Sequence, residues 1–420
     1  MRVLHTSDWH LGKFLENISR IEEQRQFIDE LCEIVEREKI DIILIAGDVF
    51  DTYNPSAAAE ELFYEAVDRL NAKGRRAVLI IAGNHDSPDR LCAASPLAYK
   101  NGIFLLGYPS SDAGIFKCES DNIRVTASGE GWLELYIRSC GQSAVILTLP
   151  YPSESRLEEV LCKNADEKSL QEVYSDKIKR ILRNLSVNFR DDTINLVVSH
   201  IYLRDGKLSD SERQLGGAFV VDSDALPPNA QYAALGHLHR PQRIKAAPVP
   251  AYYSGSPLAY SFSETDYSKA VFVVDAEPGK TAEVSEIYLK SGKQLKQWKA
   301  RNGIAEAISW CEDKRDSNCW IDLEIYTDRI ITPDEQKQLR DLNPGIINIR
   351  PVLLTDNTEK ITYQNRESRR IDELFRDYFK QKTGMEAAEE FMDVFLEIIN
   401  QDDEDLEQVI RGEELETKIS

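Results

Sequence analysis

The stretch DIILIAGDVFD, residues 41–51, decides the fold of this chain. Residues 42–46 are all apolar, which is typical of a strand that is buried on both faces. A glycine and Asp48 follow where the apolar run stops, so this carboxylate lies where a strand becomes a loop. The stretch AVLIIAGNHD, residues 77–86, repeats the arrangement with Asn84 and His85. Because ligands of open α/β sheets bind outside the carboxyl ends of the strands, we expect these side chains on one rim.

On either side of these two stretches, apolar runs alternate with amphipathic helical patterns from the start of the chain to residue 275. This alternation is the signature of an α/β domain that opens β-α-β-α-β. The expected strands cover residues 3–5, 41–46, 77–82, 103–106, 144–149, 193–199, 233–236 and 270–275.

A smaller α+β unit is expected over residues 276–354. Its strands are expected near 282–289, 320–326 and 346–352, and a helix opens at Thr332-Pro333 with a capping box to Glu335. A polar linker, 355–366, then leads to a segment, 367–420, with two helical patterns and an acidic end. We therefore divide the chain into 1–275, 276–354, 355–366 and 367–420.

The composition restricts the function. With 420 residues, 51 basic and 72 acidic, the chain carries a net charge of −21. A protein that held DNA mainly by neutralising phosphates would be basic, so DNA binding would need a local patch, metal ions or a second subunit. Seven scattered cysteines argue against a disulfide framework or a thiolate zinc site. No apolar stretch has the length of a membrane span, so we expect a cytoplasmic protein without membrane contact.

Five short motifs stand at strand ends: residues 7–10, 47–51, 83–86, 199–200 and 236–239. Five of the six histidines lie in them. Each motif alone has an ordinary explanation as a loop-capping pair, a turn or a buried core histidine. Together they offer seven nitrogen and oxygen donors, too many for one tetrahedral zinc but suited to two octahedral cations. These donors are Asp8, His10, Asp48, Asn84, His200, His237 and His239. His5 lies inside a strand, and we expect it to be structural.

The order of these motifs resembles the calcineurin-like metallophosphoesterase superfamily. Three further segments, GHLHRPQ at 236–242, SGSP at 254–257 and SFSE at 261–264, are similar to SbcD nucleases. The resemblance implies a sandwich of two mixed sheets flanked by helices. It also implies a small α+β capping domain and a C-terminal helical pair.

The resemblance also implies a ligand set, in which Asp8, His10, Asp48 and His239 hold one divalent ion and Asp48, Asn84, His200 and His237 hold the other. Asp48 is the bridge, because a carboxylate has two oxygens to share. Mn²⁺ is the first choice from the mixed ligands, with Fe²⁺ and Zn²⁺ as alternatives.

His85 is expected to contact the phosphate or protonate the leaving oxygen, with Asp86 orienting it. The alternative is a structural His85. Asp51 stands where some relatives carry a second histidine, which removes one candidate proton donor.

The function implied is a DNA nuclease, cutting duplex ends as an exonuclease and single strands and hairpins as an endonuclease, in DNA repair and recombination. The partner implied is an SbcC-type coiled-coil ATPase, with a homodimer of this chain in a heterotetramer. The alternatives are a stand-alone phosphatase or nucleotide phosphodiesterase, and an idle scaffold. The residues after 275 favour the nuclease, since a small-molecule phosphoesterase has no evident need of them.

Two further expectations concern binding surfaces. Lys13, Arg90 and Arg240 stand beside the motifs and are candidate phosphate contacts, although they could equally pair with nearby acids. The apolar stripes of 371–399 fit a helical pair that docks on the ATPase, or one that packs on the nuclease domain.

Overall fold

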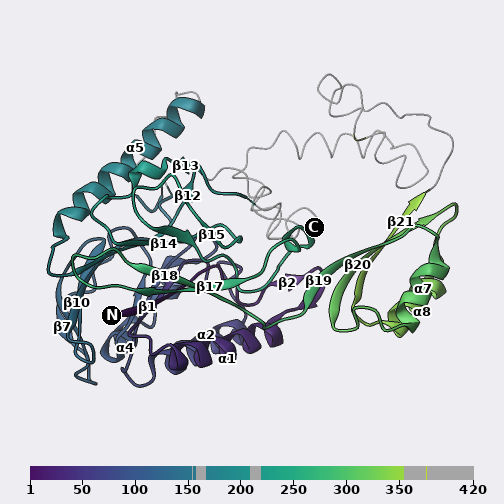
Figure 1. Cartoon of the computed structure of the whole chain (residues 1–420), viewed down its shortest axis with the longest axis horizontal. Helices are drawn as coiled ribbons and strands as arrows, with labels where there is room; N and C mark the ends of the chain where they lie inside the picture. Colours follow the sequence, from purple (N-terminus) through teal and green to yellow (C-terminus); the bar gives the residue numbers. More distant parts are fainter. Residues whose placement is uncertain (154, 158–166, 209–218, 354–374, 376–420) are drawn as a thin grey trace, which may run out of the picture. The chain divides into compact units, whose positions relative to one another are not determined.

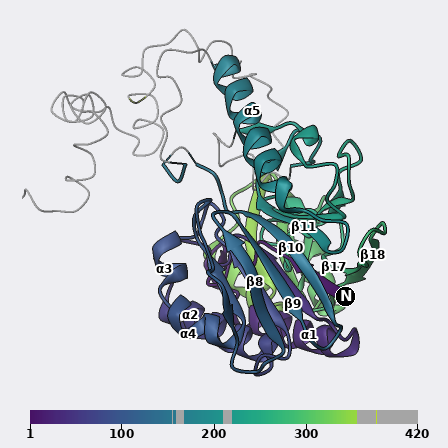
Figure 2. The same ribbon diagram turned by 90° about the vertical axis from the view of Figure 1, so that its left-hand side faces the viewer.

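Two β-sheets face each other at the centre of the computed structural model (Figures 1 and 2), which describes residues 1–153, 155–157, 167–208, 219–353 and 375. Residues 1–354 form one unit and 355–420 a second. The predicted linker 355–366 and the predicted helical segment 367–420 lie outside the described residues, apart from Phe375.

The first sheet is formed by the strands of the opening βαβαβ unit and two later strands. Its order is β18 (Glu283–Tyr288), β17 (Ala270–Asp275), β1 (Arg2–Thr6), β4 (Ile42–Ala46), β5 (Ala77–Ile81) and β6 (Ile103–Leu106). β1, β4, β5 and β6 are parallel, while β17 and β18 are antiparallel to their neighbours. The four parallel strands therefore end at the same edge.

The second sheet is longer and combines a parallel centre with antiparallel edges. Its order is β15 (Gln242–Arg243), β16 (Ala251–Tyr253), β14 (Tyr232–Gly236), β11 (Ile194–His200), β10 (Gln142–Leu149), β9 (Trp132–Ile137), β8 (Ile123–Gly129) and β7 (Phe116–Lys117). β10, β11, β14 and β16 are parallel. The sequence did not predict five strands of this sheet, which are β7, β8, β9, β15 and β16.

Helices cover the outer faces of this sandwich. Figure 2 shows α1 (Ile21–Arg37) and α2 (Ala57–Asn71) on one side and α5 (Glu167–Leu185) on the other. The apolar face of α1 packs with Ile43 and Ile45 on the outside of the first sheet, while Ile42 and Leu44 point inward to the second sheet. This alternation explains why the run 42–46 is apolar throughout. The predicted sandwich of two mixed sheets flanked by helices is confirmed.

A third, three-stranded sheet carries its own core. Its parallel strands are β19 (Gln294–Ala300), β20 (Cys319–Thr327) and β21 (Ile346–Leu353), joined by α7 (Ile304–Glu312) and α8 (Pro333–Leu342). Thr332 and Glu335 form the expected capping box at the start of α8. One expectation was wrong: residues 283–288 form a strand, but β18 pairs with β17 in the first sheet and not in this smaller unit.

The remaining short elements lie in the connections. The short strands and α-helices among them are β2 (Phe14–Leu15), β3 (Ile18–Ser19), β12 (Tyr202–Leu203), β13 (Val220–Val221), α3 (Pro88–Cys92) and α4 (Ser95–Ala98). Among the described helices, none is long and apolar enough to cross a membrane.

Candidate metal centre

The predicted donors come together where the parallel strands of both sheets end. Asp8, Asp48 and Asn84 follow β1, β4 and β5, while His200 and His237 stand at the ends of β11 and β14. The two sheets touch directly here, since Nδ1 of His200 lies 2.8 Å from the carbonyl oxygen of Ala46. The structure thus brings all seven predicted donors into one cluster.

Glycines precede three of these donors because the ends of neighbouring strands, within a sheet and between the sheets, approach so closely. A Cβ on Gly236 would lie 1.8 Å from the carbonyl oxygen of Ala46, and one on Gly83 would lie 2.1 Å from Oδ1 of Asp48. Any side chain at these positions would push the two strand ends apart. The Gly-Asn and Gly-His steps therefore serve packing as well as turning.

Four donors have positive backbone φ angles, which residues with side chains rarely adopt. The angle is 105° for His237, while it is 51° for Asp8, 46° for His10 and 48° for Asp48. Two backbone hydrogen bonds hold the last three, from the Asp8 N–H to Gly47 (3.0 Å) and from the His10 N–H to Asp48 (3.0 Å). Such strain costs roughly 1–3 kcal/mol per residue and persists where surrounding structure enforces it, often at functional sites.

Asp8, His10 and His239 form one half of the cluster, which we call the first half. Nε2 of His10 lies 3.1 Å from Nε2 of His239, and donor atoms of all three residues lie within 4.8 Å of one another. Oδ1 of Asp8 accepts the backbone N–H of His237 (2.9 Å). Asp8, His10 and His239 are all buried.

Asn84, His200 and His237 form the second half. Oδ1 of Asn84 lies 3.0 Å from Nε2 of His200 and 2.9 Å from Nδ1 of His237. Asp48 stands between the halves, with Oδ2 3.7 Å from Nε2 of His10 and 3.4 Å from Nε2 of His200. The position of Asp48 is the one that a carboxylate shared by two ions requires.

Burial and neighbouring charges set the protonation of the cluster. Burial lowers the pKa of His10 and that of His237 to about 3, so both rings are neutral at pH 7. Burial would also lower the pKa of His200, but the carboxylate of Asp48 outweighs it and raises this pKa to about 9. A cation that binds Nε2 of His200 must therefore displace a proton, which couples metal uptake to proton release.

The donor set fits two divalent ions. Two nitrogen ligands at about 2.1 Å from one ion and at right angles lie about 3.0 Å apart, close to the separation of His10 and His239. Neutral imidazoles, carboxylates and an amide oxygen match Mn²⁺, Fe²⁺ or Zn²⁺ better than Mg²⁺, which prefers oxygen ligands alone.

His85 lies at the edge of the cluster. Its ring centroid is 4.8 Å from that of His10, and Nδ1 lies 2.8 Å from the carbonyl oxygen of Asp51. The expectation that Asp86 orients His85 was wrong. The Asp86 carboxylate instead accepts three backbone N–H groups, from Gly83, Val49 and Phe50. Asp86 thus holds the loop after β4, and the backbone of Asp51 orients His85.

The comparisons with known proteins agree with this geometry. The model of the calcineurin-like phosphoesterase family matches residues 1–241. The SbcD component of the SbcCD nuclease of Bacillus subtilis is 46% identical over 400 residues, which are 95% of this chain and 97% of the relative. The chain belongs to the SbcD family of calcineurin-like phosphoesterases.

Further matches of this SbcD-family chain extend into its C-terminal part. A model described as the Type 5 capsule protein repressor C-terminal domain matches residues 291–383. The SbcD component of the SbcCD nuclease of Staphylococcus epidermidis is 27% identical over 392 residues, 93% of this chain and 95% of the relative. A solved dimetal phosphatase from Danio rerio covers 68% of this chain and 98% of its own, a distant likeness at 12% identity and a TM-score of 0.34.

The candidate DNA contacts have protein partners in this SbcD-family structure. Nζ of Lys13 lies 2.6 Å from Oδ1 of Asp51, and Arg90 pairs with Glu60 at 3.0 Å. The guanidinium of Arg240 lies over the ring of Tyr267, 5.1 Å from its centroid. Their role with DNA stays a prediction.

His5, the histidine outside the motifs, is buried within β1. Its Nδ1 lies 2.8 Å from the hydroxyl of Tyr232 and its Nε2 3.1 Å from the carbonyl oxygen of Leu235. These contacts join the two sheets, which agrees with the structural role expected for it.

Sequence reasoning missed two supports of the centre. Buried Arg156 donates to the carbonyl oxygens of Gly83 and Asp86, both at 2.7 Å, and so fixes the loop that carries Asn84. Glu264 lies behind His239, with Oε1 3.2 Å from Nδ1. In the sequence the SFSE segment marks only the family resemblance, and no local pattern pairs either residue with the cluster.

Proposed function

We propose that this chain is the metal-dependent nuclease component of a complex with an SbcC-type coiled-coil ATPase, and that it hydrolyses DNA phosphodiester bonds. The observation that carries the proposal is the convergence of seven nitrogen and oxygen donors, from the strand ends of two sheets, around Asp48. The similarity to the SbcD component of the Bacillus subtilis SbcCD nuclease supports the choice of DNA among phosphate esters.

The proposed ligands follow the two halves of the cluster. Asp8, His10 and His239 hold one ion, Asn84, His200 and His237 hold the other, and Asp48 belongs to both. Mn²⁺ is the proposed ion. Two such ions supply positive charge for the phosphate and lower the pKa of water enough to make hydroxide at neutral pH.

The remaining chemistry belongs to His85. A carbonyl oxygen only accepts hydrogen bonds, so Nδ1 of His85, 2.8 Å from the Asp51 carbonyl, carries a proton. When the ring is doubly protonated, Nε2 is the atom that gives its proton to the leaving oxygen of the cleaved strand, and the ring is left neutral with the remaining proton on Nδ1. The backbone N–H of His85 donates to Oδ1 of Asp48 (2.9 Å), which ties the proton donor to the centre.

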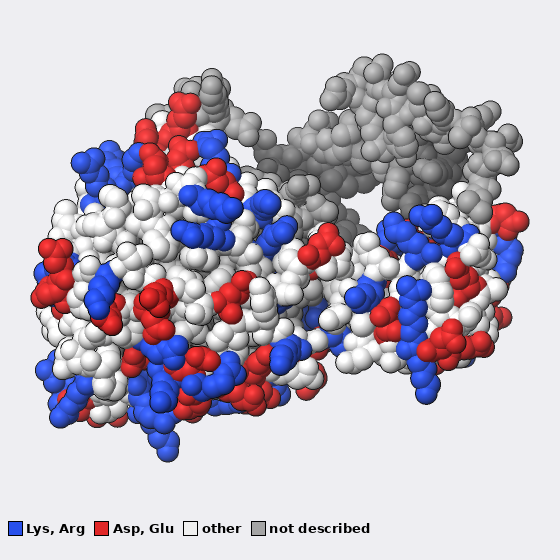
Figure 3. Space-filling view, viewed as in Figure 1, with Lys and Arg blue, Asp and Glu red and all other residues white. Residues whose placement is uncertain are grey.

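DNA must be held largely by the ions and by the partner. The chain carries a net charge of −21, and on the face in Figure 3 basic and acidic side chains are interspersed over the described residues. We propose a homodimer within a heterotetramer, acting in the cytoplasm, with segment 367–420 as the docking element for the ATPase. The apolar stripes of that segment support this assignment.

A nuclease assay tests the proposal. The intact chain, purified with and without the co-expressed ATPase, is incubated with linear duplex DNA, a DNA hairpin and a phosphate monoester, with and without Mn²⁺. We expect Mn²⁺-dependent cleavage of both DNAs and little release of phosphate from the monoester. Efficient hydrolysis of the monoester with intact DNA would favour the stand-alone phosphatase.

The docking element is tested separately by deleting residues 367–420. The shortened chain should stay folded, bind metal and hydrolyse a small phosphodiester, yet fail to co-purify with the ATPase. Aggregation of the shortened chain, when the intact chain is a stable monomer, would mean that the segment belongs to the core of this protein.

A further inference from the structure

A buried ion pair stands directly behind the first half of the cluster. Glu264, 1% exposed, lies in the SFSE segment between β16 and β17, and Lys269 follows it five residues later. Nζ of Lys269 lies 2.5 Å from Oε2 of Glu264. The other carboxylate oxygen, Oε1, lies 3.2 Å from Nδ1 of His239. Lysine, glutamate and histidine thus form one continuous chain of polar contacts.

The direction of these hydrogen bonds fixes which nitrogen of His239 faces the cluster. An ionised carboxylate only accepts, so Nδ1 of His239 must carry the proton that points to Glu264. In the neutral ring the lone pair then lies on Nε2, the atom that faces Nε2 of His10 at 3.1 Å. Carboxylates placed in this way orient metal-binding histidines and raise the basicity of the ring.

The same segment also holds the backbone of His239. Its carbonyl oxygen accepts the N–H of Ser256 (3.2 Å) and the ammonium of Lys269 (3.2 Å). Gly255 makes this approach feasible, because a Cβ there would lie 2.4 Å from that carbonyl oxygen. Lys269 donates in addition to Oγ of Ser256 (2.7 Å). Its three contacts, to Glu264, His239 and Ser256, match the three N–H groups of an ammonium.

We infer that Glu264 is a positioning residue for the metal centre, held by Lys269, which fixes the ring and tautomer of His239 for one of the two ions. This inference rests on the proposed function, because it concerns the same centre. It assigns a role to the SGSP and SFSE segments, which the proposed ligand set leaves unused.

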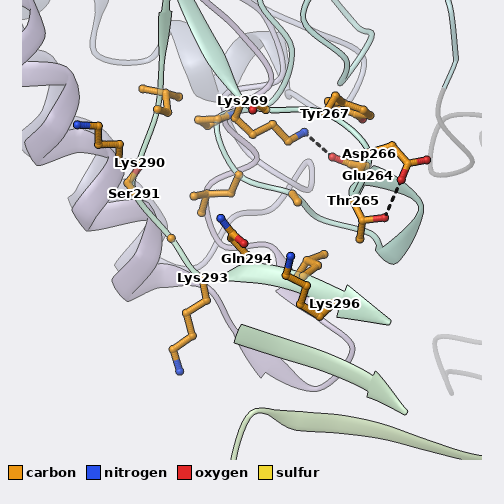
Figure 4. Close-up of a pocket in the computed structure, with 17 residues that line it drawn as sticks. Glu264, Thr265, Asp266, Tyr267, Lys269, Lys290, Ser291, Lys293, Gln294 and Lys296 are labelled. Carbon is orange, nitrogen blue, oxygen red and sulfur yellow. Dashed lines mark hydrogen bonds and ion pairs between the residues drawn. The ribbon is translucent and has the colours of Figure 1, made fainter. Parts of the chain in front are cut away.

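The buried pair forms part of the wall of a cavity. Glu264 and Lys269 line a cavity of about 530 Å³ whose other walls come from residues 257–259, 265–268 and 289–296. Figure 4 shows the Lys269 ammonium directed at Glu264 on this wall. Substitutions at either position therefore change a cavity wall and the contact with His239, while the two sheet cores stay untouched.

The test is a calorimetric Mn²⁺ titration of the metal-free, full-length protein, together with elemental analysis of bound metal. Glu264→Gln should weaken the binding of one Mn²⁺ by about 10–100-fold, the usual effect of losing such a carboxylate. The other Mn²⁺ should bind as in the wild type, and excess Mn²⁺ should restore turnover. The control is Glu134→Gln on β9, which breaks an ion pair with the half-exposed Arg190 and should leave both affinities unchanged.

A second variant separates positioning from folding. Glu264→Met/Lys269→Met replaces both charges by apolar side chains of similar length, which is often nearly neutral for stability. We expect a thermal stability close to that of the wild type with the same loss of affinity for one Mn²⁺. If this variant or Glu264→Gln binds both Mn²⁺ ions as tightly as the wild-type protein does, the inference is wrong. The proposed function would still stand in that case, provided that the wild-type protein binds two Mn²⁺ and cleaves DNA. A wild type that binds no Mn²⁺ would overturn both.

Discussion

The two halves of the metal centre are supported in different ways. In the first half, the outer nitrogens of the histidines lie near carboxylates: Nδ1 of His239 is 3.2 Å from Oε1 of Glu264 in a hydrogen bond, while Nδ1 of His10 is 3.3 Å from Oδ1 of Asp51 without hydrogen-bond geometry. In the second half, Nδ1 of His200 faces a neutral peptide carbonyl, that of Ala46. Charge thus supports one half and the backbone of a central strand supports the other.

This difference bears on how each half responds to change. The hydrogen bond of His239 to the carboxylate of Glu264 is stronger than one to a neutral acceptor, and a single substitution removes it. The carbonyl of Ala46 belongs to β4 and is present whatever side chain stands there. We therefore expect the first half to respond to substitutions of the side chains around His239, and the second half to respond to substitutions that disturb the backbone around it.

The largest effect is expected for Asp48→Asn, because this substitution changes the ligand that both halves of the metal centre share. The amide offers one oxygen where the carboxylate offers two, so the shared ligand is lost. Bound metal should fall from about two toward one per chain by elemental analysis, and turnover should fall by more than the roughly 10–100-fold of an outer contact. Two ions and full activity in this variant would remove Asp48 from the centre.

His85→Ala should separate proton transfer from metal binding. His85 contacts both Asp48 and Asp51, yet its proposed role is to donate a proton to the leaving oxygen. Turnover should fall by roughly 10²–10⁴-fold, the scale of one general acid, while both metals stay bound. A variant that loses metal would instead make His85 a metal ligand. His85 would then have to be added to the ligands of one of the two halves.

The sequence predicted the donors because each follows a recognisable signal. The apolar run 42–46 and the glycine after it point to a buried strand that ends at Asp48, and the same holds for Asn84 and His237. Parallel strands that end at one edge then bring the donors together. The close packing around Gly83 and Gly236 leaves no room for a side chain. The sequence reflects this, because a glycine is the first residue of the motifs 83–86 and 236–239.

The supports of the donors could not be predicted in this way. Glu264 stands 25 residues from His239, and Arg156 stands 73 residues from Gly83. Neither has a local pattern, since any surface segment contains glutamates and arginines. The assignment of β18 failed for a related reason: pairing with β17 depends on the edge of the first sheet, which residues 283–288 do not reveal by themselves.

Arg156→Gln should weaken the second half through its loop. Arg156 donates to the carbonyls of Gly83 and Asp86, and losing these bonds leaves buried acceptors unsatisfied at a cost of about 1–3 kcal/mol. We expect a lower melting temperature and a turnover reduced by about tenfold, the lower end for an outer contact. Arg190→Gln is the matched control, since it should lower stability without changing turnover. Equal turnover in the two variants would mean that the loop does not depend on Arg156.

The smallest effect is expected at the rim, where charge reversal of Lys13, Arg90 and Arg240 tests direct DNA contact. Nζ of Lys13 lies 2.6 Å from Oδ1 of Asp51, and the same oxygen lies 3.3 Å from Nδ1 of His10 in the first half. Reversing the charge of Lys13 therefore affects the metal centre as well as DNA binding. Arg90 lies away from it, paired with Glu60 at 3.0 Å.

The three reversals are therefore made singly and together, and duplex binding is measured against salt with the ATPase present. Each true phosphate contact should lower the slope of log affinity against log salt by about 0.9. If only Lys13→Glu changes binding, and metal content falls with it, the residue serves the first half of the centre and not the DNA. An unchanged slope in the triple variant would assign phosphate neutralisation to the ATPase, which is what a net charge of −21 leads us to expect for most of the duplex.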